Sequence, residues 1–138
     1  MSELFSELLS YLPQDEGLLP KWLLLVSIIA VANSVQTYAT LQFTKRVYSA
    51  RPDQVNGLSS RTFGTWTFLA SVLRLYAAYN ITNPVVYDLA IWSYAIAGWH
   101  FLSEWLIFGT ASMGAGLIGP IIVSSLSTTW MITQRGLY

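Results

Sequence analysis

Residues 62–79 are apolar, aromatic or small, with one exception: a single charge, Arg74, lies well inside the run. In water, a helix of this kind would bury almost its whole circumference and still hold an arginine among apolar neighbours. In a bilayer, the same run makes a spanning helix, and Arg74 then needs polar partners from adjacent helices because an unpaired charge in lipid is costly. The other apolar runs of the chain are the expected neighbours.

The composition of the chain agrees with a membrane protein. Of its 138 residues, 54% are hydrophobic and 10% are charged, whereas soluble domains carry about 25% charged residues. The net charge is zero, which argues against a nucleic-acid-binding protein because phosphate binding needs clustered Lys and Arg. The absence of cysteine removes disulfides, thiolate metal sites and cysteine nucleophiles.

The apolar runs predict an all-α membrane protein, in which residues 1–138 form one domain built as a small bundle of four transmembrane helices. The length of each run falls in the range of about 17–25 residues that a helix needs to cross a hydrocarbon core. The predicted spans are residues 22–43, 62–81, 85–108 and 117–133. Residues 1–20 form an amino-terminal extension, which contains either a short helix at an interface or a frayed terminus.

The connection between the first two spans is the basic part of the chain. Residues 44–61 hold Lys45, Arg46, Arg51 and Arg61, whereas the third connection contains no Lys or Arg. Connections on the cytosolic side of a membrane carry the excess of these residues. We therefore expect loop 44–61 to be cytosolic and both termini to lie on the opposite side of the membrane.

Amides and ionisable groups inside the spans are the candidate interaction residues. Asn33 and Gln36 lie in the first span and are expected to face other helices, where amides find hydrogen-bond partners. A rise of about 1.5 Å per residue places Arg74 near the level of Asn33 and His100 near that of Gln36. We expect amides, carbonyl groups or another subunit to satisfy Arg74.

Glu104 lies near the end of the third span, and the same count of helical rise places it close to the level of Arg61. We hypothesise a structural contact between these two side chains. Asp88 lies at the other edge of the third span, where the sequence indicates no particular partner.

The sequence predicts no catalytic, cofactor-binding or metal site. His100 and Glu104 are one helical turn apart and could address one ligand, but His100 is the only histidine and a metal site needs three or four ligands. Residues 114–119 match the glycine fingerprint of dinucleotide-binding proteins letter for letter. That fingerprint needs a preceding strand and an acidic residue about 20 positions later, and no Asp or Glu follows Glu104.

Five blocks of the sequence resemble one known family, the ergosterol biosynthetic protein 28 family. The blocks are Leu19–Leu24, Asn33–Tyr38, Leu58–Phe68, His100–Phe108 and Gly116–Pro120. They occur in the same order as in the family, and the resemblance extends from Leu19 to Arg135.

The resemblance implies a non-catalytic scaffold in the endoplasmic-reticulum membrane, and in that membrane the side expected for the termini from the charge count is the lumen. It implies three partners in sterol C-4 demethylation, namely the C-4 methylsterol oxidase, the decarboxylating C-3 sterol dehydrogenase and the 3-keto sterol reductase. For fungal members it also implies a link to the sterol C-24 methyltransferase. Membrane lipids and sterols surround such a protein, and its small residues together with Arg74 make a homo-oligomer a further expectation.

Two alternatives to a scaffold remain open at this point. One is a sterol or lipid-intermediate carrier, with a pocket among the aromatic-rich second and third spans. The other is a small membrane enzyme that uses His100 and Glu104, which is the weaker hypothesis because the chain provides no further catalytic group beside them.

Overall fold

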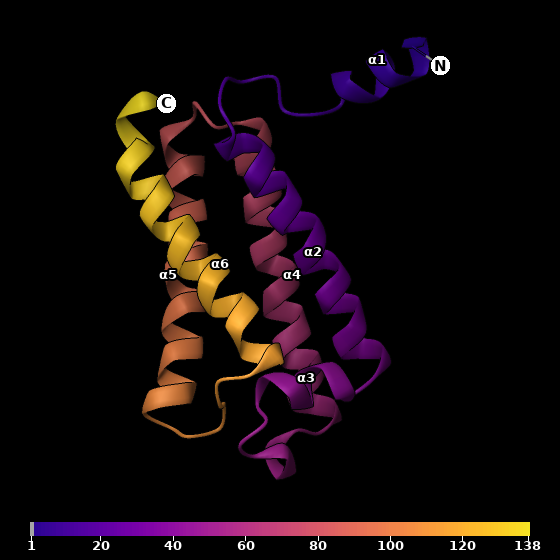
Figure 1. Cartoon of the computed structure of the whole chain (residues 1–138), viewed down its shortest axis with the longest axis vertical. Coiled ribbons are helices and arrows are strands. Elements are labelled where there is room, and N and C mark those ends of the chain that lie inside the picture. The colour runs from indigo at the N-terminus through magenta and orange to yellow at the C-terminus, as the bar shows by residue number, and fades with distance from the viewer. Residues whose placement is uncertain (1) are drawn as a thin grey trace.

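The computed structural model describes residues 2–138, and every regular element in that range is helical. The prediction of an all-α fold is therefore confirmed. Figure 1 shows the long helices side by side, short helical turns at one end, and a separate amino-terminal helix at the other. The elements are α1 Ser2–Ser10, α2 Leu19–Ala39, α3 Gln42–Val47, η1 Pro52–Gln54, α4 Gly57–Tyr79, α5 Pro84–Leu106, α6 Ala115–Gln134 and η2 Arg135–Leu137.

The four long helices run in alternating directions along the bundle. α2 packs along α4, α5 packs along α6, and α4 joins the two pairs by contacting α5. The start of α2 and the end of α6 therefore lie at one end of the bundle, and α3 and η1 lie at the opposite end (Figure 1). The basic loop and the chain termini are consequently separated by the full length of the bundle.

Helix boundaries follow from local capping. The Asn56 side chain accepts a hydrogen bond from the Ser59 amide, and Ser59 bonds back to Asn56, which completes a capping box. α4 therefore begins at Gly57, five residues before the predicted span. Pro84 occupies the first turn of α5, where its missing N–H is tolerated.

The first predicted span, residues 22–43, is wrong at its carboxyl end. α2 ends at Ala39, Thr40 has extended backbone, and Gln42–Val47 form the separate helix α3. α3 packs against α6, where a Cβ atom on Gly116 would lie 2.3 Å from the Arg46 carbonyl oxygen. The chain turns after α2 because this close contact, with Thr44 and Val47 buried, anchors α3 beneath the bundle.

The core is divided between the two ends of the bundle. At the end with the termini, Leu23, Tyr87 and Met131 belong to one cluster of buried side chains. At the α3 end, Phe63 and Leu117 belong to a second cluster, in which Phe63 packs against four other aromatic rings. A cavity and the buried Arg74 lie between these two clusters.

Two helices are long and apolar enough to cross a membrane, judged by length and composition: Leu19–Ala39 and Ala115–Leu137. α4 and α5 each contain 23 residues, which corresponds to about 35 Å, but neither is apolar enough to pass the same test. The membrane character of the chain thus rests on α2 and α6.

The amino-terminal extension contains the helix α1, and its place at an interface stays a prediction. Leu4, Phe5, Leu8 and Leu9 are all exposed on α1, which contains no buried residue. The segment after α1 is held to the bundle where the Tyr79 hydroxyl donates to the Tyr11 carbonyl oxygen at 2.6 Å.

Candidate functional site

Arg74 is buried at the centre of the bundle, with 6% of its surface exposed. Its Nε atom donates to the Ser93 hydroxyl at 3.1 Å, and its Nη2 atom donates to the Ser93 carbonyl oxygen at 3.2 Å. The guanidinium carbon lies 4.0 Å from the centre of the Tyr94 ring, a distance typical of a cation–π contact. Both partners come from α5, so Arg74 links the two central helices of the bundle.

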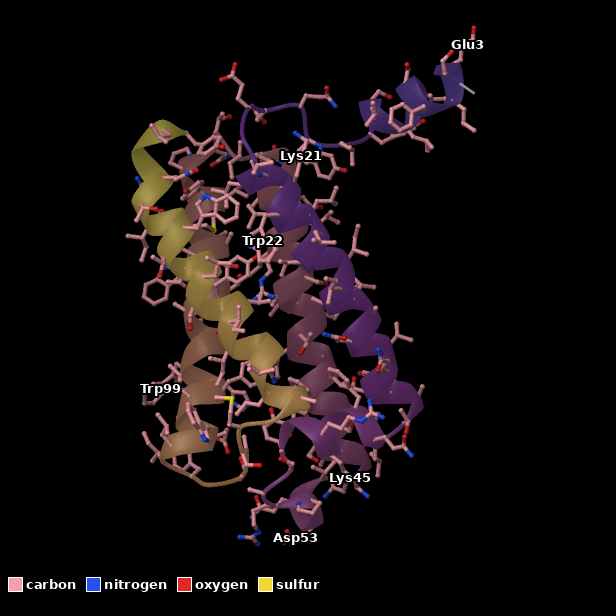
Figure 2. All side chains as sticks on the ribbon, in the orientation of Figure 1. Glu3, Lys21, Trp22, Lys45, Asp53 and Trp99 are labelled. Carbon is pink, nitrogen blue, oxygen red and sulfur yellow. The ribbon has the colours of Figure 1, made fainter. Side chains whose placement is uncertain are left out.

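A cavity of about 210 Å³ adjoins Arg74, lined mainly by apolar side chains from all four long helices. Trp22 and Asn33 line it from α2, and Thr67 from α4. Figure 2 shows Trp22 directed between the helices and Trp99 directed away from them. Two buried oxygens that belong to its lining residues, Thr67 Oγ1 and the Tyr94 hydroxyl, have no hydrogen-bond partner within residues 2–138.

The two candidate amides of α2 have different surroundings in the structure. Asn33 lines the cavity that Arg74 also lines, so the predicted level of these two residues agrees with the structure. Gln36 is exposed, and the expectation that it faces another helix is wrong. The packed side of α2 follows a helical stripe that includes Ala30, Ser34 and Thr37, and Gln36 falls outside that stripe.

His100 and Glu104 lie at the α3 end of the bundle, beside a second cavity of about 460 Å³. The Tyr48 hydroxyl and Nε2 of His100 are hydrogen-bonded at 2.5 Å. Burial is the main cause that raises the pKa of the Tyr48 phenol, and the nearby charge of Glu104 raises it further. Tyr48 therefore stays protonated at physiological pH. His100 contacts Tyr48, and Gln36, which was predicted at the same level, does not line this cavity.

The hypothesised contact between Glu104 and Arg61 is wrong. Glu104 Oε1 accepts a hydrogen bond from the Thr110 hydroxyl at 2.6 Å, and its carbonyl oxygen accepts one from the Thr110 amide at 2.9 Å. Arg61 is exposed and lies along its own helix, close to Gly57. The loop after α5 folds back over Glu104, so its carboxylate is satisfied locally.

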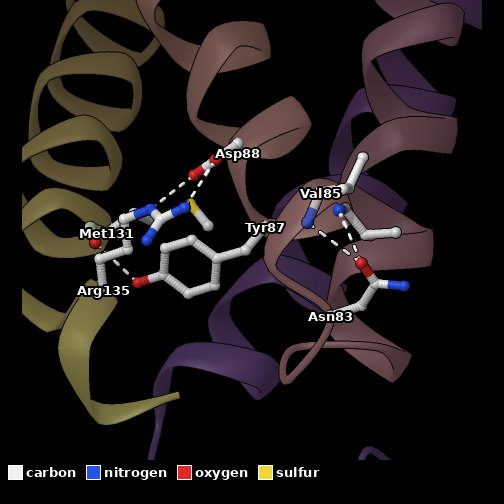
Figure 3. Close-up of polar contacts among 7 residues, drawn as sticks. Asn83, Val85, Tyr87, Asp88, Met131 and Arg135 are labelled. Atoms are coloured by element: carbon white, nitrogen blue, oxygen red, sulfur yellow. Dashed lines mark hydrogen bonds and ion pairs between the residues drawn. The ribbon is translucent and has the colours of Figure 1, made fainter.

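A bidentate ion pair that the sequence did not predict joins Asp88 to Arg135. The distances are 2.6 Å from Nε to Oδ1 and 2.7 Å from Nη2 to Oδ2, and the neighbouring Tyr87 hydroxyl donates to the Met131 carbonyl oxygen at 2.6 Å (Figure 3). The start of α5 is thus fixed to the end of α6. The sequence could have indicated this pair, because Asp88 and Arg135 carry opposite charges at the ends of two consecutive antiparallel spans, which lie side by side.

Within residues 2–138, no three His, Asp or Glu side chains gather as possible ligands of a metal ion. Arg74 is therefore the group through which this site can bind a ligand, because it is a buried cation with unused N–H groups beside a mainly apolar cavity. Such an arrangement can bind an anion or a carbonyl oxygen attached to an apolar group.

Comparison with known proteins defines the family. The model of the family described as "Erg28 like protein" matches residues 19–129. The chain belongs to the Erg28 family. The matched residues run from the start of α2 into α6 and include Arg74, both cavities and His100, but not α1.

Several relatives of the chain are named ergosterol biosynthetic protein 28. The protein of that name from Candida albicans is 52% identical over 97% of this chain and 96% of its own length. The one from Saccharomyces cerevisiae is 48% identical over 89% of this chain and 84% of its own length. The human homolog is 40% identical over 84% of each chain. No solved structure matches the chain.

Proposed function

We propose that this protein is a non-catalytic scaffold in the endoplasmic-reticulum membrane that holds together the enzymes of sterol C-4 demethylation. The proposed partners are the C-4 methylsterol oxidase, the decarboxylating C-3 sterol dehydrogenase and the 3-keto sterol reductase, with the sterol C-24 methyltransferase as a further partner. Membership of the Erg28 family, whose relatives are named for ergosterol biosynthesis, is the observation that carries this proposal.

We propose further that all four long helices span the membrane. α4 and α5 are as long as α2 and pack beside the two apolar helices, so they lie at the same depth. Both helices expose large apolar side chains on their outer surfaces, with Leu69 and Tyr76 on α4 and Trp92 and Ile96 on α5. The buried charge of α4, Arg74, lies inside the bundle, as expected for a charge at membrane depth.

The outer face of α5 is the best candidate surface for partner helices. Trp92, Ile96 and Trp99 are 59–64% exposed, and their spacing of four and three residues aligns them on one side of the helix. Tryptophan side chains often contribute most of the binding energy at protein interfaces. A membrane helix of a partner enzyme could pack against this stripe without disturbing the core of the bundle.

A scaffold acts by raising the effective concentration of its partners, which reaches the millimolar range when two of them are held on one molecule. The polar groups near the second cavity fit this role better than catalysis. His100 is hydrogen-bonded to Tyr48 and the Glu104 carboxylate to Thr110, and within residues 2–138 no third His, Asp or Glu side chain gathers with them. Replacing both His100 and Glu104 by Ala should therefore leave sterol output unchanged if the protein is a scaffold.

The test is a pull-down of the tagged protein from microsomes in mild detergent, with the recovered proteins identified by mass spectrometry. We expect the oxidase, dehydrogenase and reductase to be recovered together, and the double substitution W92A/W99A to reduce at least one of them several-fold. The matched control is I28A/V35A, which changes side chains of α2 that are 57% and 62% exposed. Recovery of the protein alone would overturn the proposal.

The cavity favours a second candidate function, the binding of a sterol or lipid intermediate. It is apolar, adjoins a buried polar group and is lined by all four long helices. Photo-crosslinking with a sterol probe separates this function from a pure scaffold, which should be labelled no more than an unrelated membrane protein.

A further inference from the structure

Arg74 carries a charge that nothing in the bundle neutralises. The ion pairs within residues 2–138 are Arg51–Asp53 and Arg135–Asp88, so no carboxylate contacts Arg74. Its Nε and Nη2 atoms bond to Ser93, whereas Nη1 makes no hydrogen bond in this part of the chain. A buried cation of this kind is costly unless an anion or several acceptor oxygens accompany it.

The cavity beside Arg74 opens sideways between α2 and α6. Of its lining residues, Ile29 on α2 and Gly119 on α6 are exposed. The two helices are joined near the termini, where the Trp22 indole donates to the Ser127 hydroxyl at 2.9 Å. A ligand in the surrounding lipid therefore has an opening that leads towards Arg74.

We propose that this cavity binds an apolar molecule that carries a single carboxylate, with the carboxylate paired to Arg74. The Nη1 atom of Arg74, unbonded within residues 2–138, is the donor available to that carboxylate. The rest of the wall is mainly apolar, with Val26, Phe63 and Val123 among its residues, and Asn33 and Ser124 are polar exceptions. An uncharged sterol would leave the guanidinium unpaired, whereas a carboxylate neutralises it.

The volume indicates how much of the ligand enters. Pockets that enclose a whole small molecule measure about 300–1,000 Å³, and this cavity measures about 210 Å³. The carboxylate and the adjoining rings or chain therefore lie inside. The remainder of the ligand lies between α2 and α6, in contact with lipid.

This inference deepens the proposed function and rests on it for the identity of the natural ligand. A methyl oxidase that acts before a decarboxylating dehydrogenase must produce a carboxylic acid, which the dehydrogenase then consumes. An apolar carboxylate is thus the intermediate that passes between two of the proposed partners. A scaffold that binds it would keep it close to the second enzyme.

The test uses the full-length protein in nanodiscs of phosphatidylcholine, which is neutral overall. The probe is cholanoic acid bearing a photoreactive diazirine, and the comparison probe is its methyl ester, which has the same rings and no charge. We expect saturable labelling of cavity residues by the acid, with the ester weaker by about tenfold, which corresponds to about 1.4 kcal/mol. Equal labelling by the two probes, or labelling spread over the outer surface, would overturn the proposal.

Two glycines provide a matched pair of variants. A Cβ atom on Gly119 or on Gly136 would have no neighbour within 4 Å, so both positions accept a larger side chain without a clash. Gly119→Leu fills the opening of the cavity and should abolish labelling by the acid. Gly136→Leu lies outside the cavity and should leave it unchanged. Undiminished labelling of the Gly119→Leu protein would contradict the assignment.

A substitution of Arg74 tests the charge. Arg74→Lys should retain labelling by the acid in part, and Arg74→Met should reduce it to the level of the ester. The pull-down of the enzymes is a separate readout. If Gly119→Leu loses labelling but still recovers the enzymes, the result supports the site and leaves the scaffold intact. If the unaltered protein is labelled but recovers no enzymes, only the proposed function is overturned.

Discussion

At the scale of single residues, Arg74 is the position where a substitution should abolish ligand binding without lowering the stability of the protein. The Ser93 hydroxyl that accepts from Arg74 also donates to the Ala90 carbonyl oxygen at 2.7 Å. Removing the guanidinium therefore leaves no buried group of Ser93 without a partner. Apolar replacements of buried charges are often neutral or stabilising when nothing is left unpaired.

We accordingly predict that Arg74→Met unfolds at the same temperature as the unaltered protein or at a higher one, because a desolvated charge is removed and the apolar stem is kept. Thermal unfolding in detergent, followed by tryptophan fluorescence, measures this. The account requires that the same variant loses binding of the steroid carboxylate. A loss of more than about 2 kcal/mol of stability would show instead that Arg74 is retained for folding.

The sequence allowed part of this site to be predicted. The charge of Arg74 within an apolar run indicated a buried polar contact, and counting helical rise placed Asn33 near it. The direction of each side chain around its helix was not predictable in the same way. Gln36 and Thr37 are adjacent in sequence, yet Thr37 is buried between α2 and α4 and Gln36 is exposed.

At the scale of elements, the contact between α2 and α4 is the closest helix pair in the bundle. A Cβ atom on Gly64 would lie 1.9 Å from Oγ1 of Thr37 and 3.1 Å from the Ser34 carbonyl oxygen. The Ser60 hydroxyl donates to the Thr37 carbonyl oxygen at 2.7 Å across the same contact. Glycine at position 64 is thus what permits the two backbones to approach.

We predict that Gly64→Ala destabilises the bundle by about 1–3 kcal/mol, because the added methyl group separates α2 from α4 or displaces Thr37. Gly119→Ala is the control, since its methyl group meets no atom and alanine favours a helix over glycine by up to about 1 kcal/mol. Denaturation of both variants in the same detergent gives the comparison. Equal stability of the two proteins would mean that the close contact does not constrain the fold.

Element boundaries were less predictable than the elements themselves. Long apolar runs indicated the four helices, but the break between α2 and α3 has no Pro or Gly to signal it. It depends on Thr44 and Val47 being buried against the rest of the bundle, which is a tertiary effect. The pairing of Asp88 with Arg135 also depends on which helix ends meet, and Glu104 is satisfied by Thr110 in a loop whose path the sequence did not indicate.

At the scale of the whole molecule, charge is distributed unequally between the two ends of the bundle. Lys45, Arg46, Arg51 and Arg61 gather at the α3 end, and Glu3, Glu7, Asp15 and Glu16 lie on the amino-terminal segment. Lys45 and Asp53 mark one end in Figure 2, and Glu3 and Lys21 mark the other. Under the positive-inside rule, this asymmetry predicts a cytosolic α3 end.

The natural chain contains no cysteine, so single cysteines report its topology without background. Asp53→Cys should react with a membrane-impermeant maleimide in sealed microsomes, because loop 44–61 is proposed to face the cytosol. Gly136→Cys should react only after the membrane is permeabilised. The reverse pattern would invert the topology, and reaction of both residues in sealed vesicles would contradict the odd number of spans, α4, α5 and α6, between them.

The central claim is that this protein joins enzymes that would otherwise separate, and one measurement tests that claim most directly. The tagged C-4 methylsterol oxidase is purified from microsomes in mild detergent, with and without this protein, and the co-purified decarboxylating dehydrogenase is quantified. The account predicts that the dehydrogenase is recovered with the oxidase only when this protein is present, and that restoring the protein restores the recovery. Equal recovery of the dehydrogenase in its absence would contradict the scaffold.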